Sequence, residues 1–252
     1  MRHNGFVAFI LTHGRPDRVL TYEKLRKHGY TGKIYIVCDD EDKTLPEYRK
    51  RFGDVLVFSK SEIAKTFDEG DNFGDRRAII YARNACFELA RQIGATHFIE
   101  LDDDYTYFKF RFDDQLRWHG ADVQDLDAVF DMLLDYFNSA PMNSFICSVD
   151  RPFQFVGRIN EDVNTYVLLG SRGGVFLSIL QIGLDQLETQ SNSGGMTELY
   201  LDAGTYVKSF YTVMYCPSCV VVSAMGTAHR RLHHHIKWRY AVPKILRESV
   251  KK

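Results

Sequence analysis

The chain lacks several patterns that would place it in a membrane or fibrous class. Its longest apolar runs, such as residues 219–225 (CVVVSAM), are far too short to cross a bilayer as a helix. The N-terminal residues contain no small-residue cleavage site, so we expect a first strand there and not a signal peptide. Repeats and low-complexity tracts are absent, and the 252 residues have the composition of an ordinary globular protein.

Glycine-rich phosphate-binding motifs are missing as well. The sequence contains neither GxGxxG nor the GxxxxGKS or GxxxxGKT pattern. By motif, the chain is therefore neither a dinucleotide-binding Rossmann protein nor a P-loop nucleoside triphosphatase. A nucleotide bound here would depend on a metal ion and on arginines to neutralise its phosphates.

Cysteine is scarce, with Cys38, Cys86, Cys147, Cys216 and Cys219 as the only five. Their odd number and scattered positions argue against a disulfide framework and indicate a reducing cytoplasm. The CPSC motif at residues 216–219 has the spacing of a zinc or redox pair. A zinc site would need a second pair of cysteines, and a redox site would need a thioredoxin-like context. We therefore interpret Cys216 and Cys219 as small residues at the entrance of a strand.

The net charge of −1 hides an uneven distribution. Residues 226–252 hold eight basic residues and one acidic residue, a net of +7, which leaves 24 basic and 32 acidic residues elsewhere, a net of −8. A basic tail on an acidic body suggests an anionic partner, although a solvated terminal helix would show the same pattern.

The first half of the chain alternates between strand and helix patterns. Apolar runs predict strands over residues 5–13, 33–40, 54–60 and 95–101, and helices are predicted over 15–29, 45–53 and 75–94. This alternation predicts an α/β fold with a mostly parallel sheet and helices on both faces.

The second half has a less regular pattern. We expect strands over residues 106–112, 144–149, 165–170, 174–180 and 219–225, and helices over 122–137 and 241–252. No helix pattern separates the strands at 165–170 and 174–180, so this part of the sheet is expected to be mixed or antiparallel.

Polar residues follow three of the predicted parallel strands, where ligands bind in open α/β sheets. They are Thr12, His13 and Arg15 after the first strand, Asp39 and Asp40 after the second, and Asp102, Asp103 and Asp104 after the fourth. Carboxylates with a nearby arginine and histidine suit a nucleotide and a divalent cation. Arg76 and Arg83 are seven residues apart in the predicted 75–94 helix, so one helix face would present both to the same anion.

The segment LDDD, after a helix that contains ARN, resembles the GT-A glycosyltransferases, which transfer a sugar from a nucleotide-sugar donor. The resemblance covers residues 5–104 and implies a GT-A fold, with Asp102 and Asp104 as the DxD motif. It implies that Asp102 touches the donor sugar or ribose, that Asp104 together with Asp102 holds Mn²⁺ or Mg²⁺, and that Asp39 or Asp40 binds the base and ribose. Asp103 would point away if strand geometry persists, and we expect it to matter least.

Two later segments fit the same resemblance. It implies that Glu161 or Asp162 takes the proton from the acceptor hydroxyl, although an acidic turn is an equal alternative. It also implies that a histidine shortly after the last core strand is a further metal ligand, and His229 lies there. Which of His229, His233, His234 and His235 binds the metal stays open, and the others would contact phosphates or be exposed. Whether the reaction inverts or retains the anomeric configuration stays open.

Four blocks, ILTHGRP, FIELDDD, INEDVNTYVLLGSRGG and RRLHHHIKWRYAVPKI, resemble the phage-encoded TET-associated glycosyltransferases over nearly the whole chain. That resemblance implies a UDP-sugar donor and, as acceptor, the hydroxymethyl group of a pyrimidine such as 5-hydroxymethylcytosine in DNA, in the cytoplasm of the host cell. Residues 1–225 would form the catalytic domain, and 226–252 a basic segment that completes the site. In that segment Arg230, Arg231, Lys237, Arg239 and Lys244 would contact phosphates, and Trp238 and Tyr240 would stack on a base.

Three other functions remain open from the sequence. The chain could act on a glycan, protein or small molecule, or it could be a non-catalytic nucleotide- or DNA-binding module. A nucleotidyltransferase also uses paired aspartates, but the missing glycine-rich motif and the ARN helix favour sugar transfer.

Overall fold

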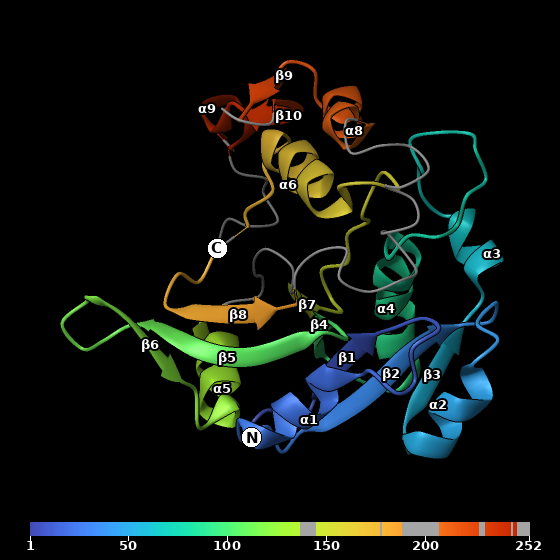
Figure 1. Cartoon of the computed structure of the whole chain (residues 1–252), viewed down its shortest axis with the longest axis vertical. Helices are drawn as coiled ribbons and strands as arrows, with labels where there is room; N and C mark the ends of the chain where they lie inside the picture. The colour runs from blue at the N-terminus through green and yellow to red at the C-terminus, as the bar shows by residue number, and fades with distance from the viewer. Residues whose placement is uncertain (137–144, 177, 188–206, 227–229, 243, 246–252) are drawn as a thin grey trace. The chain divides into compact units, whose positions relative to one another are not determined.

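The computed structural model describes residues 1–136, 145–176, 178–187, 207–226, 230–242 and 244–245 (Figure 1). The chain divides into two compact units. The first unit comprises Met1–Lys60, Ala82–Pro152 and Leu177–Ser191, and the second comprises Ser61–Tyr81, Phe153–Phe176 and Asn192–Lys252. No helix of the described ranges is long and apolar enough to span a membrane.

The centre of the first unit is a five-stranded sheet in the order β3-β2-β1-β4-β7. Its strands are β1 (Phe6–Leu11), β2 (Lys33–Asp39), β3 (Val55–Phe58), β4 (His97–Asp102) and β7 (Phe145–Ser148). The first four strands are parallel and β7 runs antiparallel to β4. All six residues of β1 are buried, as expected for a central strand covered on both faces.

Helices cover both faces of this sheet (Figure 1). Alternate residues of β1, including Ala8 and Ile10, pack with buried residues of α1 (Leu20–Lys27), α2 (Leu45–Arg51) and α5 (Leu126–Tyr136). On the other face Phe9 contacts Phe98, with ring centroids 5.3 Å apart, and Phe98 contacts Phe87 of α4 (Ile80–Gln92) at 5.1 Å. The expected α/β architecture with a mixed, mostly parallel sheet is therefore confirmed.

A second, antiparallel sheet continues directly from the central one. It contains β5 (Tyr105–Phe112) between β6 (Trp118–Asp122) and β8 (Ile182–Gln186). Because β5 begins at Tyr105, the three consecutive aspartates lie where β4 passes into β5. The last residue of β8, Gln186, is in register with Tyr105, so the end of β8 lies beside this junction.

The second unit contains α6 (Glu161–Ser171), α8 (Val207–Tyr215), the hairpin β9 (Val220–Met225) and β10 (Arg231–Ile236), and α9 (Trp238–Ala241). Helix α3 (Lys60–Ala64) begins at the boundary between the units. Buried Val167 of α6 packs with the two buried cysteines of the CPSC motif and with Val220. All five cysteines are buried free thiols.

Two expected strands are wrong. Residues 165–170 belong to helix α6, and the described residues of 174–180 form no strand. Valine, threonine and tyrosine favour strands locally, but packing of Val167 against Val220 overrides that preference. Strands β8 and β10 and helix α8 were not predicted from the sequence. Most of the predicted 241–252 helix lies outside the described residues.

Candidate active site

The carboxyl edge of the parallel strands brings together the polar residues predicted to meet there. Leu11 at the end of β1 is in register with Val37 of β2 and with Asp102 of β4. The loops after Leu11 and Asp39 and the three aspartates therefore lie at one edge of the sheet.

Asp102 and Asp104 share a contact with the same amide. The Nε2 atom of Gln186 lies 2.9 Å from Oδ1 of Asp104 and 3.3 Å from Oδ2 of Asp102. Because both carboxylates reach one nitrogen atom, their oxygens converge on a common point. Gln186 lies 84 and 82 residues away in the sequence, and no motif singled it out.

Asp103 faces away from this point, as strand alternation predicts. Its side chain is buried and accepts a hydrogen bond from Thr12 Oγ1 at 2.6 Å, and Arg15 Nη2 lies 3.0 Å from its other oxygen. The Tyr48 hydroxyl contacts Thr12 Oγ1 at 2.8 Å and accepts the Arg15 backbone N–H at 2.8 Å. Burial raises the pKa of Asp103 to about 6, against the opposing effects of Arg15 and Thr12.

The backbone of the three aspartates is held by the first turn of α1. Thr21 Oγ1 donates to the carbonyl of Asp102 at 2.6 Å and accepts the N–H of Tyr105 at 2.9 Å. Its own N–H donates to the carbonyl of Asp103 at 3.2 Å. Sequence reasoning missed Thr21, because a threonine inside an amphipathic helix carries no distinguishing signal.

Arg83 occupies a buried position behind Asp102. Its guanidinium lies 3.3 Å from Glu100 Oε2 and 3.5 Å from Asp102 Oδ1, and Glu100 is fully buried. Burial raises the pKa of Glu100 to about 8, although the positive charge of Arg83 lowers it. The guanidinium thereby connects a buried carboxyl to one of the two convergent carboxylates.

The expectation that Arg76 and Arg83 share one helix face is wrong. Helix α4 begins only at Ile80, so Arg76 precedes it and belongs to the second unit. The chain before Ile80 is held in a non-helical conformation by its own aspartates, for example by Asp75 Oδ1, which accepts the N–H of Arg77 at 3.0 Å.

His13, Asp39 and Lys60 form a charged cluster at the same edge of the sheet. Asp39 Oδ2 lies 2.7 Å from His13 Nδ1 and 3.1 Å from Lys60 Nζ, and both Asp39 and Lys60 are buried. The hydrogen bond with Asp39 raises the pKa of His13 against the opposing effect of burial. Burial alone would raise the pKa of Asp39, but His13 and Lys60 lower it. Exposed Asp40 accepts the N–H of Lys60 at 2.9 Å through Oδ1.

Lys60 was missed by the sequence reasoning. It follows the third strand in a segment of serine and lysine, which resembles an ordinary surface turn. Only its buried contact with Asp39 distinguishes Lys60 from a surface lysine.

In the second unit, Glu161 and Asp162 lie in the first turn of α6. Glu161 is buried, whereas Asp162 is half-buried and its Oδ1 accepts the N–H of Val163 at 2.7 Å. Asn160, just before the helix, has a left-handed backbone with φ 58°, and its Nδ2 lies 3.5 Å from His234 Nδ1. Burial lowers the pKa of His234 to about 4.

The proposed histidine ligand, His229, lies outside the described residues. His233, His234 and His235 belong to strand β10, where alternation turns His234 inward and leaves His235 exposed. Within the described ranges, no three histidine, cysteine or acidic side chains form a group that could hold a metal ion.

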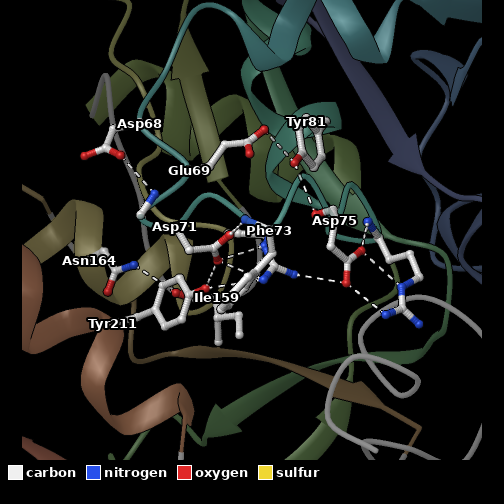
Figure 2. A network of polar contacts seen from close by, with 12 residues as sticks. Asp68, Glu69, Asp71, Phe73, Asp75, Tyr81, Ile159, Asn164 and Tyr211 are labelled. Carbon is white, nitrogen blue, oxygen red and sulfur yellow. Dashed lines mark hydrogen bonds and ion pairs between the residues drawn. The ribbon is translucent and has the colours of Figure 1, made fainter. Parts of the chain in front are cut away.

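Residues 68–77 of the second unit, here called the acidic strap, form a polar network that the sequence did not predict (Figure 2). Buried Arg158 lies 2.8 Å from Asp71 Oδ2 and 3.4 Å from Asp75 Oδ2. Tyr211 points toward Asp71 and donates a hydrogen bond to it, and Tyr81 donates to Glu69 at 2.9 Å. The network fixes the strap against the segment around Arg158.

Comparison with known proteins assigns the chain to a family. A comparison with curated proteins found no match. The family model for TET-Associated Glycosyltransferase matches residues 6–143, which include the four parallel strands of the central sheet, the three aspartates and helix α5. This match spans more than half of the chain, so the protein belongs to the TET-associated glycosyltransferase family and is a glycosyltransferase.

Proposed function

We propose that this enzyme transfers a sugar from a UDP-sugar to the hydroxymethyl group of a modified pyrimidine in DNA, in a reaction that requires a divalent cation. The observation that carries the proposal is the convergence of Asp102 and Asp104 at the carboxyl edge of a parallel sheet, where both carboxylates contact one nitrogen atom.

The convergent carboxylates fit a hard cation such as Mn²⁺ or Mg²⁺. Carboxylate oxygens are the ligands that these ions prefer, and they usually bind together with substrate phosphates. Asp102 and Asp104 would hold the ion, with His229 as the further ligand implied by the family resemblance. When bound, the cation would neutralise negative charge on the leaving diphosphate.

The chain's own residues would hold and orient the donor. Arg83, anchored by Glu100, fixes one oxygen of Asp102 and leaves the other directed toward Gln186. At the other end of the edge, Asp39 orients His13, whose raised pKa favours the positive form next to an anionic ligand. Arg15 lies beside Asp103, and exposed Asp40 is available to a ribose hydroxyl. Arg76 remains a candidate for the donor diphosphate.

We assign the general base to Asp162, with Glu161 as the alternative. Asp162 is the more exposed of the two carboxylates. It would accept the proton of the acceptor hydroxyl as the hydroxyl oxygen bonds to the anomeric carbon and the bond to the diphosphate breaks. In a reaction that retains the anomeric configuration, the same carboxylate would orient the acceptor instead.

The basic C-terminal segment supports a nucleic-acid acceptor. Arg231, Lys237 and Arg239 are exposed, as are the rings of Trp238 and Tyr240. The cations of Arg239 and Lys244 lie 5.8 Å and 5.6 Å from the centre of the Tyr240 ring. Exposed aromatic rings among cations are suited to a base next to phosphates, and the target nucleotide would have to leave its stack to be modified.

Donor hydrolysis tests the metal and donor assignments. UDP-glucose hydrolysis should require Mn²⁺ or Mg²⁺, and it should be lost in Asp104→Ala but kept in Asp114→Ala, which removes an exposed acid outside the cluster. Metal-independent hydrolysis, or full activity of Asp104→Ala, would overturn the metal assignment. A nucleotide that binds without any turnover of the donor would indicate a non-catalytic module.

The acceptor is tested with a radiolabelled donor sugar and two otherwise identical DNA duplexes, one hydroxymethylated and one plain. Label should enter only the hydroxymethylated duplex. If the label enters a glycan, a protein or a small molecule but neither duplex, that molecule and not DNA is the acceptor.

DNA binding by the tail is tested separately from chemistry. The affinity for DNA should fall steeply with salt, and Arg230→Gln with Arg231→Gln should reduce the slope of log K against log salt by about 2. Arg151→Gln, which changes an exposed arginine of the first unit, should leave the slope unchanged. An affinity that does not change with salt would show that the C-terminal segment does not contact DNA phosphates.

A further inference from the structure

Gln186 lies at the candidate site, but it is outside the residues that the family model matches and belongs to none of the sequence motifs. It ends strand β8 and is exposed, and the backbone pairing of β8 with β5 holds it opposite Tyr105, immediately after the aspartates. Its amide nitrogen contacts both Asp102 and Asp104. A single nitrogen within hydrogen-bond distance of two carboxylates lies at the point on which their oxygens converge.

From this geometry we infer that Gln186 is a further ligand of the divalent cation, through its side-chain carbonyl oxygen. The inference rests on the proposed metal-dependent function and deepens it. Without a cation, the amide N–H groups offset the repulsion between Asp102 and Asp104. With a cation at the point of convergence, the amide presents its oxygen to the ion.

The exchange of nitrogen for oxygen requires little movement. A glutamine amide carries its donor nitrogen and its acceptor oxygen on the same carbon, and rotation about the last side-chain torsion exchanges their positions. Gln186 is exposed, so this rotation is not opposed by close packing. A cation repels the amide N–H groups and attracts the carbonyl oxygen, and neutral amide oxygens are ordinary ligands of hard cations.

The neighbouring side chains are already engaged elsewhere. Asp103 faces Thr12 and Arg15, and the carboxylate of Asp185 lies 2.5 Å from Lys109 Nζ. Arg83 lies next to Oδ1 of Asp102, whereas Gln186 contacts Oδ2 of the same residue. Arg83 and Gln186 thus contact different oxygens of Asp102.

The test measures Mn²⁺ binding directly, without a donor or turnover, by the loss of the free-ion signal in electron paramagnetic resonance. Gln186→Ala should weaken Mn²⁺ binding about tenfold, and Gln186→Glu should restore or tighten it because a carboxylate supplies the same oxygen with a charge. Gln181→Ala, which removes an exposed glutamine one residue before β8, should bind as the wild type does.

The alternative is that Gln186 only competes with the cation. In that case Gln186→Ala would tighten Mn²⁺ binding, because the amide would no longer have to be displaced. Tighter or unchanged binding in Gln186→Ala, measured on protein whose circular dichroism matches the wild type, would overturn the inference.

The wild type and Asp104→Ala separate this inference from the proposed function. If the wild type binds no Mn²⁺, or if Asp104→Ala binds as well as the wild type, the metal-dependent function fails and the inference fails with it. If binding depends on Asp104 but not on Gln186, only the role of Gln186 is overturned.

Discussion

At the scale of single residues, the three consecutive aspartates have three different environments. Asp103 is buried between Thr12 and Arg15, while Asp102 and Asp104 share a contact with Gln186. The middle aspartate therefore belongs to the framework that joins the ends of β1 and β4. That Asp103 matters least for ligand binding stays a prediction. For stability, its buried contacts indicate a larger role.

Asp103→Ala should lower the free energy of unfolding by about 2 kcal/mol, because it leaves polar groups of Thr12 and Arg15 without their carboxylate partner. Asp104→Ala should cost less than about 0.5 kcal/mol without metal, since it relieves repulsion from Asp102. Urea unfolding of both variants at neutral pH measures the difference. Equal losses of stability would contradict the separate roles of the two residues.

The pair of His13 and Asp39 should make stability depend on pH. The pKa of His13 is raised from 6.5 in the folded protein, chiefly by the hydrogen bond with Asp39. Its contribution is therefore complete below pH 6.5 and is lost as the pH rises through the folded-state pKa. The stability advantage of the wild type over His13→Gln should thus shrink as the pH rises from ~6 to ~9, as measured by urea unfolding. An NMR titration that gives His13 a pKa below 6.5 would contradict this expectation.

At the scale of elements, side chains decide where regular structure begins and ends. Helix α4 starts at Ile80, although its helical pattern extends back to residue 75, because the preceding residues belong to the acidic strap. Arg158 neutralises both Asp71 and Asp75 within that strap. Without this arginine, Asp71 would lose its cation, whereas Asp75 would keep Arg77 at 2.8 Å.

Arg158→Met should release the acidic strap and lower the free energy of unfolding by about 3 kcal/mol, since it leaves the largely buried carboxylate of Asp71 without its cation. Amide hydrogen exchange over residues 68–77 should become faster, and trypsin should cleave sooner at Arg76 and Arg77. Arg151→Met removes an exposed arginine and serves as the matched control. Unchanged exchange in Arg158→Met would show that the backbone contacts alone hold the strap.

At the scale of the whole molecule, neither unit is a continuous piece of chain. The chain passes from one unit to the other after residues 60, 81, 152, 176 and 191. The expected division into residues 1–225 and 226–252 stays a prediction, and strands β9 and β10 pair across that boundary, from Val220 with Ile236 to Met225 with Arg231.

A chain that ends after Met225 should lose the fold of its second unit. The truncation removes β10, whose pairing holds β9 and whose Leu232 carbonyl accepts a hydrogen bond from Ser209 of α8 at 2.9 Å. Hydrogen exchange should accelerate across α8 and β9 while the central sheet of the first unit stays protected. A truncated chain with full protection of α8 would instead support an independent terminal segment.

The sequence by itself determined the parallel strands and the edge at which the acids meet. Those strands are largely apolar, and chain direction alone places their carboxyl ends together, so local pattern was sufficient for Thr12, Asp39 and Asp102. Helix α6 was missed, because the valine, threonine and tyrosine residues after Asp162 favour a strand locally.

Only the tertiary structure decided how each polar residue at that edge is used. Thr21, Lys60 and Gln186 contact the acids from segments between about 20 and more than 80 residues away, and nothing local distinguishes them from surface residues. Asp103 and Arg83 are buried and contact internal partners. Asp102 and Asp104 instead point toward a common position beside Gln186. A sequence pattern fixes which way a strand runs, whereas partners distant in the chain fix whether a carboxylate supports the framework or faces a ligand.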